Sequence, residues 1–219
     1  DIFTLAAPLL LSFDKKVAFY KSWKFLFPAI FIMAVFFIAK DIIFATYGIW
    51  SFNDDYLIGF RLVGLPIEEW LFFIVVPYAS VFIYACLLAY LKVDPLKKIH
   101  RPFFFALSIV LLVVGVLNYS KLYTSIIFIA TALLILYNLK SRQPWLSMFL
   151  LAYFVTFIPF LLVNGILTGS FIPEPIVSYD PTQNLNIRIF TIPIEDSIYN
   201  LMMLMMTVQL MEWFRKGKG

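Results

Sequence analysis

Cysteine, histidine and charge are all scarce in this sequence of 219 residues. It has one cysteine, Cys86, so no disulfide can form within the chain, and one histidine, His100, which excludes a Cys/His zinc site. Charged residues make up 14%, against about 25% in a typical soluble domain. Apolar residues make up 63%, and the mean hydropathy is +0.92. This composition excludes a disordered chain or an ordinary water-soluble enzyme and indicates an integral membrane protein.

Motifs for nucleotides and cofactors are also missing. There is no GxGxxG or Walker loop, and His100 lies in a basic loop, away from any serine and aspartate that could form a triad. No flavin-binding fold is encoded, so we expect a reaction without a cofactor or metal. Nothing in the sequence indicates a nucleic-acid partner.

The apolar residues gather into segments of a length that can cross a bilayer. About 20 residues at 1.5 Å each span a hydrocarbon core of roughly 30 Å. We expect six such spans, and Ile2–Phe13 as the remainder of a seventh whose start precedes Asp1. The six are Phe25–Ile43, Pro66–Leu91, Pro102–Leu117, Leu122–Leu139, Trp145–Leu167 and Pro193–Trp213. The predicted fold is an all-α polytopic membrane bundle of seven transmembrane helices.

Basic residues alternate between the connections, as the positive-inside rule requires. Most of the 17 follow the first, third, fifth and seventh spans, while Arg61, Lys121 and Arg188 lie in the other connections and Lys40 lies inside the second span. We therefore expect the C-terminus to be cytoplasmic, in a bacterial inner membrane, with the basic clusters contacting anionic lipid.

A duplicated motif divides the chain into two halves. Residues 60–73 read FRLVGLPIEEWLFF and residues 187–200 read IRIFTIPIEDSIYN, at an offset of 127. Further upstream, AKDIIF and LVNGIL set Asp41 against Asn164. The repeat predicts two parallel three-helix modules, residues 1–91 and 121–219, joined by an extra helix in residues 92–120. The long aromatic connection before each motif predicts an ordered cap.

Each copy of the motif places two acids directly after a proline that begins a helix. The pairs are Glu68 with Glu69 and Glu195 with Asp196. Acids at a helix start complement the macrodipole, so capping alone can explain them. Their duplication and their position at the start of membrane segments favour general acid–base work on an apolar substrate. Phe, Tyr and Trp rings near the motifs could stabilise a carbocation.

The motifs PIEEWLFF and PIEDSIYN, in two tandem modules, resemble the integral-membrane lycopene cyclases. SFDKKVAFYKSWKF, GIWSFN and NGILTGSFIPEPI extend the resemblance over essentially the whole chain. Members of this family occur as paired small subunits in some bacteria and as one fused chain elsewhere, and this sequence is similar to the fused form. It departs from a strict repeat where Ser197 and Asn200 stand at the positions of Trp70 and Phe73.

The resemblance implies a redox-neutral lycopene β-cyclase, an isomerase of carotenoid biosynthesis. An acid would protonate C1=C2 of lycopene or a similar linear carotenoid, C5=C6 would close the ring, and a base would remove a proton. It points to Glu68 and Glu195 for this chemistry, with Glu69 and Asp196 beside them, and leaves the donor and the acceptor unassigned.

We further expect Arg61 and Arg188 to keep neighbouring carboxylates ionised, with Asp41 and Asn164 in support. Membrane lipid and a second copy of the chain are the other expected partners. Three alternatives stay open: a carotenoid hydratase or a cyclase giving another ring, a proton-coupled transporter, and a membrane scaffold.

Overall fold

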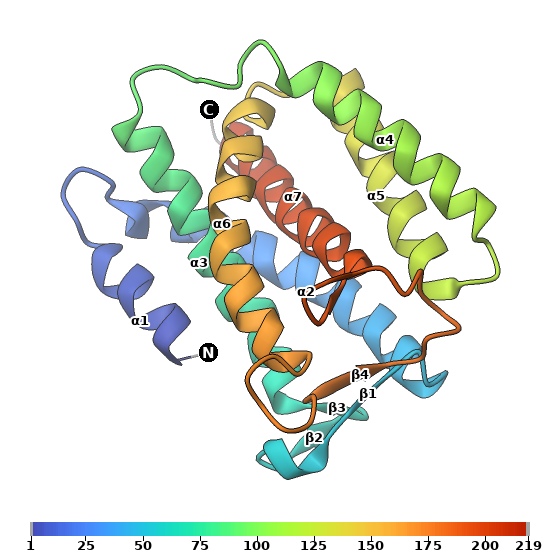
Figure 1. The fold of residues 1–219 in the computed structure, drawn as a ribbon. Helices are drawn as coiled ribbons and strands as arrows, with labels where there is room; N and C mark the ends of the chain where they lie inside the picture. The colour runs from blue at the N-terminus through green and yellow to red at the C-terminus, as the bar shows by residue number, and fades with distance from the viewer. Residues whose placement is uncertain (1, 218–219) are drawn as a thin grey trace.

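The fold is a bundle of seven helices, described for residues 2–217 in a computed structural model (Figure 1). Short 3-10 turns at Phe19–Ser22 and Asp54–Tyr56 lie in the connections. The all-helical prediction is confirmed, and most helices begin and end within three residues of the expected bounds. The helices are α1 (Ile2–Leu11), α2 (Trp23–Thr46), α3 (Ile67–Tyr90), α4 (His100–Leu117), α5 (Leu122–Lys140), α6 (Leu146–Leu167) and α7 (Ile194–Lys216).

Five of the predicted spans, α2 to α6, are long and apolar enough to cross a membrane. Of the seven transmembrane helices expected, five are therefore found within residues 2–217. Helix α1 has ten residues and is too short. Helix α7 has 23 residues but carries polar side chains that are buried inside the protein, among them Glu195, Asp196 and Asn200. A helix enclosed by its neighbours does not need the apolar surface that lipid demands.

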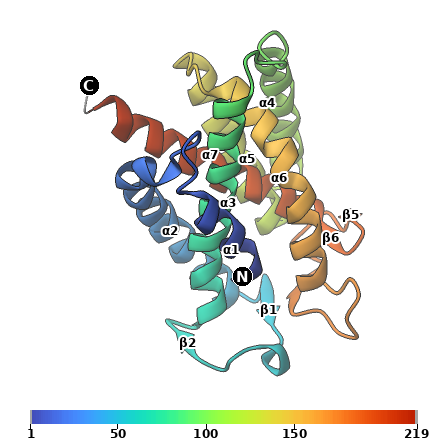
Figure 2. The ribbon, with the colours of Figure 1, turned by 90° about the vertical axis from the view of Figure 1, so that its left-hand side faces the viewer.

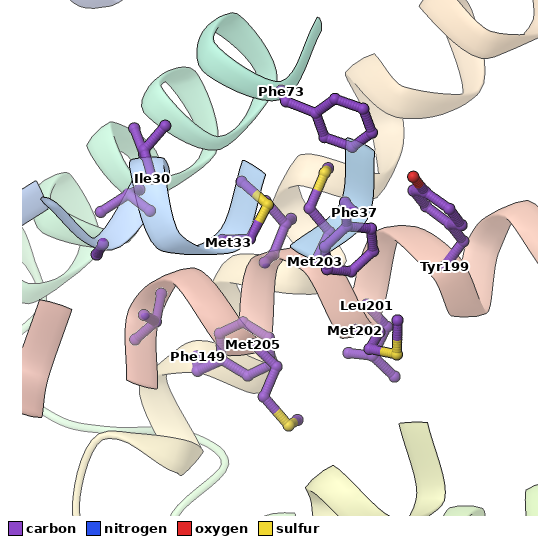
Figure 3. Close-up of a cluster of buried hydrophobic side chains, with 14 of the residues drawn as sticks. Ile30, Met33, Phe37, Phe73, Phe149, Tyr199, Leu201, Met202, Met203 and Met205 are labelled. Carbon is purple, nitrogen blue, oxygen red and sulfur yellow. The ribbon is translucent and has the colours of Figure 1, made fainter. Parts of the chain in front are cut away.

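Helix α7 lies in the middle of the bundle and is the element around which the others pack (Figures 1 and 2). It contacts α2, α3, α5 and α6, while α1 packs on α3 and α4 packs on α5. Figure 3 shows part of the resulting core, in which Met203 of α7 lies beside Met33 and Phe37 of α2, while Met205 lies beside Phe149 of α6. The methionine run is thus core packing, for which flexible thioethers are well suited.

Six short strands, which the sequence analysis did not predict, lie near the helix ends that carry the acid motifs. Strand β1 (Trp50–Phe52) pairs antiparallel with β4 (Val177–Tyr179), joining the two long connections. The pair lies at one end of the bundle, opposite the connection 91–99 and the end of α7 (Figure 1). These paired strands confirm that the connections form an ordered cap.

The other four strands form two matching hairpins that lead directly into α3 and α7. Strands β2 (Arg61–Leu62) and β3 (Leu65–Pro66) form the first, and β5 (Arg188–Ile189) and β6 (Ile192–Pro193) the second. The backbone N–H of Ile67 donates to Phe60 and that of Ile194 to Ile187, at the same 127-residue offset. The repeated sequence therefore has the same local conformation in both places.

Candidate active site

A small cavity of about 60 Å³ lies where both helix starts meet the cap. Three carboxyl groups line it, those of Asp41 (α2), Glu69 (α3) and Asp196 (α7), together with Asn164 of α6. The rest of the wall is mainly aromatic, with rings from four helices and both cap strands. These rings belong to Trp50, Phe52, Phe72, Tyr123, Phe160, Tyr179 and Tyr199. The cavity thus combines ionisable groups with a largely apolar surface.

Asp196 is buried and accepts three hydrogen bonds. The hydroxyls of Tyr123 and Tyr179 donate to it over 2.5 and 2.7 Å, and the Asn164 amide donates over 2.8 Å. Burial and the neighbouring Asp196 carboxylate raise the pKa of Tyr179, in the cap, well above its usual value. Tyr179 therefore remains a hydrogen-bond donor throughout the physiological pH range, and the three donors together favour an ionised Asp196.

Glu69 occupies the position equivalent to Asp196 in the first motif, 127 residues earlier. It lines the same cavity, beside Phe72. Within residues 2–217 it forms no hydrogen bond or ion pair, so its carboxyl is free to meet a molecule in the cavity. One acid from each motif therefore faces this space, with contrasting surroundings.

Asp41 is fully buried and forms an ion pair with the adjacent Lys40. It also accepts a hydrogen bond of 2.7 Å from the hydroxyl of Tyr199. The Lys40 ammonium lies 4.2 Å from the centre of the Tyr199 ring and 5.0 Å from that of Trp50, so aromatic faces surround it. The pair places two opposite charges at the edge of the cavity.

The remaining two acids of the motifs, Glu68 and Glu195, do not line the cavity. Each accepts a hydrogen bond from the backbone N–H ten residues upstream, Ile58 at 2.8 Å and Leu185 at 2.7 Å. Glu195 also accepts one of 2.6 Å from the Thr124 hydroxyl. Successive residues at a helix start point in different directions, so one acid of each pair holds the connection while the next reaches the cavity.

Among residues 2–217, neither Arg61 nor Arg188 forms an ion pair or a hydrogen bond with a motif carboxyl, which differs from the expectation that they hold these carboxyls ionised. The Arg61 guanidinium pairs with Asp54 at 2.5 Å and donates to the Gly64 carbonyl, and that of Arg188 donates to Thr191. The reason is the two-residue hairpin turn, which brings the arginine next to the carbonyl three residues ahead. Both arginines therefore stabilise hairpins at the exposed surface.

Several residues that complete the site were not among the candidates expected from the sequence. Lys40 carried a usable signal, because a lysine inside an apolar span is costly and needs a partner. Tyr123 and Tyr179 carried none, since tyrosine is common throughout the chain, whereas Tyr199 lies within the second motif and was expected there as one of the aromatic rings near the acids. Asp41 and Asn164, the supporting candidates, both line the cavity. They are not equivalent positions, however: the sequence alignment paired them at an offset of 123 residues, whereas the backbone hydrogen bonds in the turns that end α2 and α6 match at an offset of 121. Among residues 2–217, no group of three or more His, Cys, Asp or Glu is placed to hold a metal ion.

Comparison with protein families identifies a relationship that covers both halves of the chain. The family model described as lycopene cyclase matches residues 1–87 and 120–214, which is most of the sequence. The residues between the two matched segments, 88–119, include all of α4. The chain has no match among curated proteins or among solved structures.

Proposed function

The chain belongs to the lycopene cyclase family, and from this premise we propose that it closes a β-type ring at the end of a linear carotenoid. Glu69 and Asp196 are the acid and the base of this reaction. The observation that carries the proposal is that these two carboxyls, at equivalent places in the two motifs, line one aromatic cavity.

The reaction needs one proton given and one proton removed. The carboxylic acid of Glu69 protonates C2 of the terminal C1=C2 bond, leaving a positive charge at C1 and a carboxylate at Glu69. The electrons of C5=C6 then form the C1–C6 bond and move the charge to C5. Asp196 removes the proton from C6, which restores a C5=C6 double bond inside the ring. Atoms and electrons balance, so no oxidant or reductant is consumed.

The surroundings of the two acids support this division of roles. Three donors stabilise the carboxylate form of Asp196, the form in which a base accepts a proton. Glu69 lines the cavity together with Phe72 and has no such donors within residues 2–217. Without donors to stabilise a carboxylate, its surroundings suit a group that begins the cycle protonated. After each turnover the proton returns from Asp196 to Glu69, and a cavity of about 60 Å³ is large enough for a bridging water.

The wall of the cavity suits a cationic intermediate. The faces of Trp50, Tyr179 and Phe72 carry negative quadrupole density that attracts a carbocation. Asp41 adds a carboxylate, while its ion pair with Lys40 offsets the lysine charge that would otherwise oppose the cation. The site therefore stabilises positive charge without placing a free ammonium next to it.

Two three-helix modules, residues 1–91 and 121–219, explain why the acids meet. In this division α1, α2 and α3 correspond to α5, α6 and α7. The packing of α1 on α3 then has its counterpart in that of α5 on α7, and the packing of α2 on α7 has its counterpart in that of α6 on α3. The family match also breaks across 88–119, where we place the linking helix. The basic ends of the spans support a cytoplasmic C-terminus in a bacterial inner membrane.

The test is expression in bacteria that accumulate lycopene, followed by chromatography of the pigments. The wild-type protein should convert lycopene into products with β rings. Glu69→Gln and Asp196→Asn should each lower conversion by about 100-fold or more, the range for loss of a general acid or base. Membrane content of each variant is measured by immunoblot, so that loss of protein is not mistaken for loss of chemistry.

Glu68→Gln is the matched control, because it removes a motif carboxyl that does not line the cavity and the amide oxygen can still accept from Ile58. It should retain most of the activity. Unchanged lycopene with well-expressed wild-type protein would reject the cyclase function and leave a transporter. A hydroxylated acyclic product would identify a hydratase, and full activity of Asp196→Asn would remove Asp196 from the mechanism.

A further inference from the structure

A second, larger cavity adjoins the one that holds the acids. It is a groove of about 350 Å³ between α3 and α6, bordered by α1 and α7. Its wall is mainly apolar, with Val76, Ala79 and Ile83 on α3 facing Pro159 and Val163 on α6. Ile83 lies eleven residues after Phe72 on α3, a rise of about 17 Å, which is enough for several conjugated double bonds of an extended polyene.

The groove and the acid cavity share part of their walls. Phe72, Phe160, Asn164 and Asn200 line both. Asn200 is 2% exposed, and its Oδ1 has no hydrogen-bond partner among residues 2–217. A buried amide oxygen without a partner is costly, so its position between the two spaces needs a reason other than stability.

The equivalent position in the first motif is filled differently. Phe73 stands 127 residues before Asn200 and is fully buried. Its ring lies 5.9 Å from that of Phe37, and the ring of Phe37 lies 5.1 Å from that of Tyr199 (Figure 3). Large side chains thus occupy the core on that side, whereas on the other side the smaller, polar Asn200 lines both cavities.

We propose that the groove between α3 and α6 holds the polyene chain of the carotenoid, with Asn200 at the neck through which its reacting end enters the acid cavity. This inference rests on the proposed function, because it assigns the binding site of that same substrate. An apolar groove that shares part of its wall with the acid cavity fits the uncyclised part of the molecule, and Asn200 lies where the two spaces meet, next to the end that becomes positively charged.

The first experiment fills the groove away from the acids. Ala79→Phe places a ring in it, and Ala34→Phe is the control, since Ala34 lies on α2 in a separate apolar groove and is similarly buried, at 9% against 8% exposed. In lycopene-accumulating cells, Ala79→Phe should lower ring formation by about tenfold or more, as expected when an apolar pocket no longer fits its substrate. Ala34→Phe should stay within about twofold of wild type on the same scale.

The second experiment measures occupancy and does not depend on catalysis or on a bulky substitution. In a Cys86→Ser, Asp196→Asn background, a cysteine is placed at Ser80 in the groove or, as control, at Ala39 in the α2–α3 groove. The reagent is a membrane-permeant maleimide, applied to vesicles with and without lycopene. Lycopene should slow modification at position 80 several-fold and leave position 39 unchanged.

The outcomes separate this inference from the proposed function. If the wild-type protein forms no rings, the proposed function is rejected, whatever the modification rate at position 80. A wild-type protein that forms rings, with equal modification rates at position 80 with and without lycopene, overturns the groove as the polyene site. Normal ring formation by Ala79→Phe overturns it as well.

Discussion

Ser51 pairs with Ser178 at the centre of the β1–β4 ladder, and the two residues are 127 positions apart. The same offset relates Glu69 to Asp196 and one hairpin to the other. A residue that pairs with its own equivalent is the signature of a two-fold axis passing between them, as at an isologous dimer interface. We therefore place the pseudo-two-fold axis of the proposed modules between these serines.

This axis explains the shared cavity. Two equivalent acids on opposite sides of a two-fold axis both point towards it when either one does. A duplicated capping signal could then supply two carboxyls to one site without any change in backbone. The differences between the halves, Asn200 against Phe73 and the donors around Asp196, match the distinct roles that we propose for the two acids.

Tyr179→Phe should weaken the proposed base. It removes a hydrogen bond to a charged group that contributes about 1.5–3 kcal/mol. We expect ring formation to fall by about tenfold or more. Because the lost donor favours ionised Asp196, the acidic limb of the rate–pH profile should also move to higher pH. The profile is measured in lycopene-containing vesicles, and Tyr47→Phe in the exposed connection serves as control. An unchanged profile would contradict the role of Tyr179.

Lys40→Met should destabilise the protein strongly, because it leaves the Asp41 carboxylate buried without its ion-pair partner. The expected cost is about 3–5 kcal/mol. The double variant Lys40→Met/Asp41→Asn removes both charges and keeps an acceptor for Tyr199, so it should recover most of that stability. Thermal unfolding in detergent measures both. Equal losses in the single and double variants would show that the two charges do not stabilise each other.

Glu195→Ala should loosen the second connection, since it leaves the Leu185 N–H and the buried Thr124 hydroxyl without an acceptor. We expect a loss of about 1–3 kcal/mol in unfolding free energy. Glu195→Gln keeps an amide oxygen in the same place and should lose less. Proteolysis of the 168–193 connection, followed over time, reports the local effect. If the two variants are cut at the same rate, the carboxyl does not anchor this segment.

Arg61→Ala should change little, because its ion pair with Asp54 is exposed and such pairs contribute about 1 kcal/mol or less. Ring formation should stay close to that of the wild type. The sequence-based hypothesis, in which Arg61 tunes a catalytic carboxyl, demands a clear loss of activity. Pigment analysis at equal expression decides between the two.

The helices were predictable because hydrophobic runs and proline positions act locally. The bounds of α5 and α6 come within one residue of the expected spans, and the acid motifs do begin α3 and α7. The cap was foreseen as ordered, but its strands were not, since strands of two or three residues have no periodic pattern to detect.

Which of two neighbouring acids lines the cavity could not be predicted from the sequence. Glu68 and Glu69 are chemically alike and adjacent, so residue type alone favoured neither, and their surroundings come from segments such as 58–62 and the cap. The tyrosines around Asp196 reach it from α5 and β4, which are 73 and 17 residues away in the chain.

By itself, the amino-acid sequence determined that this protein is helical and membrane-embedded and that it carries a duplicated acid motif, because composition, hydropathy and repetition are properties of the linear chain. Tertiary packing decided which acid of each pair lines the cavity, which residues surround that acid and where an apolar groove lies beside the cavity. Those outcomes depend on side chains from distant segments meeting in space, and the direction of each side chain is set by the helix packing around α7.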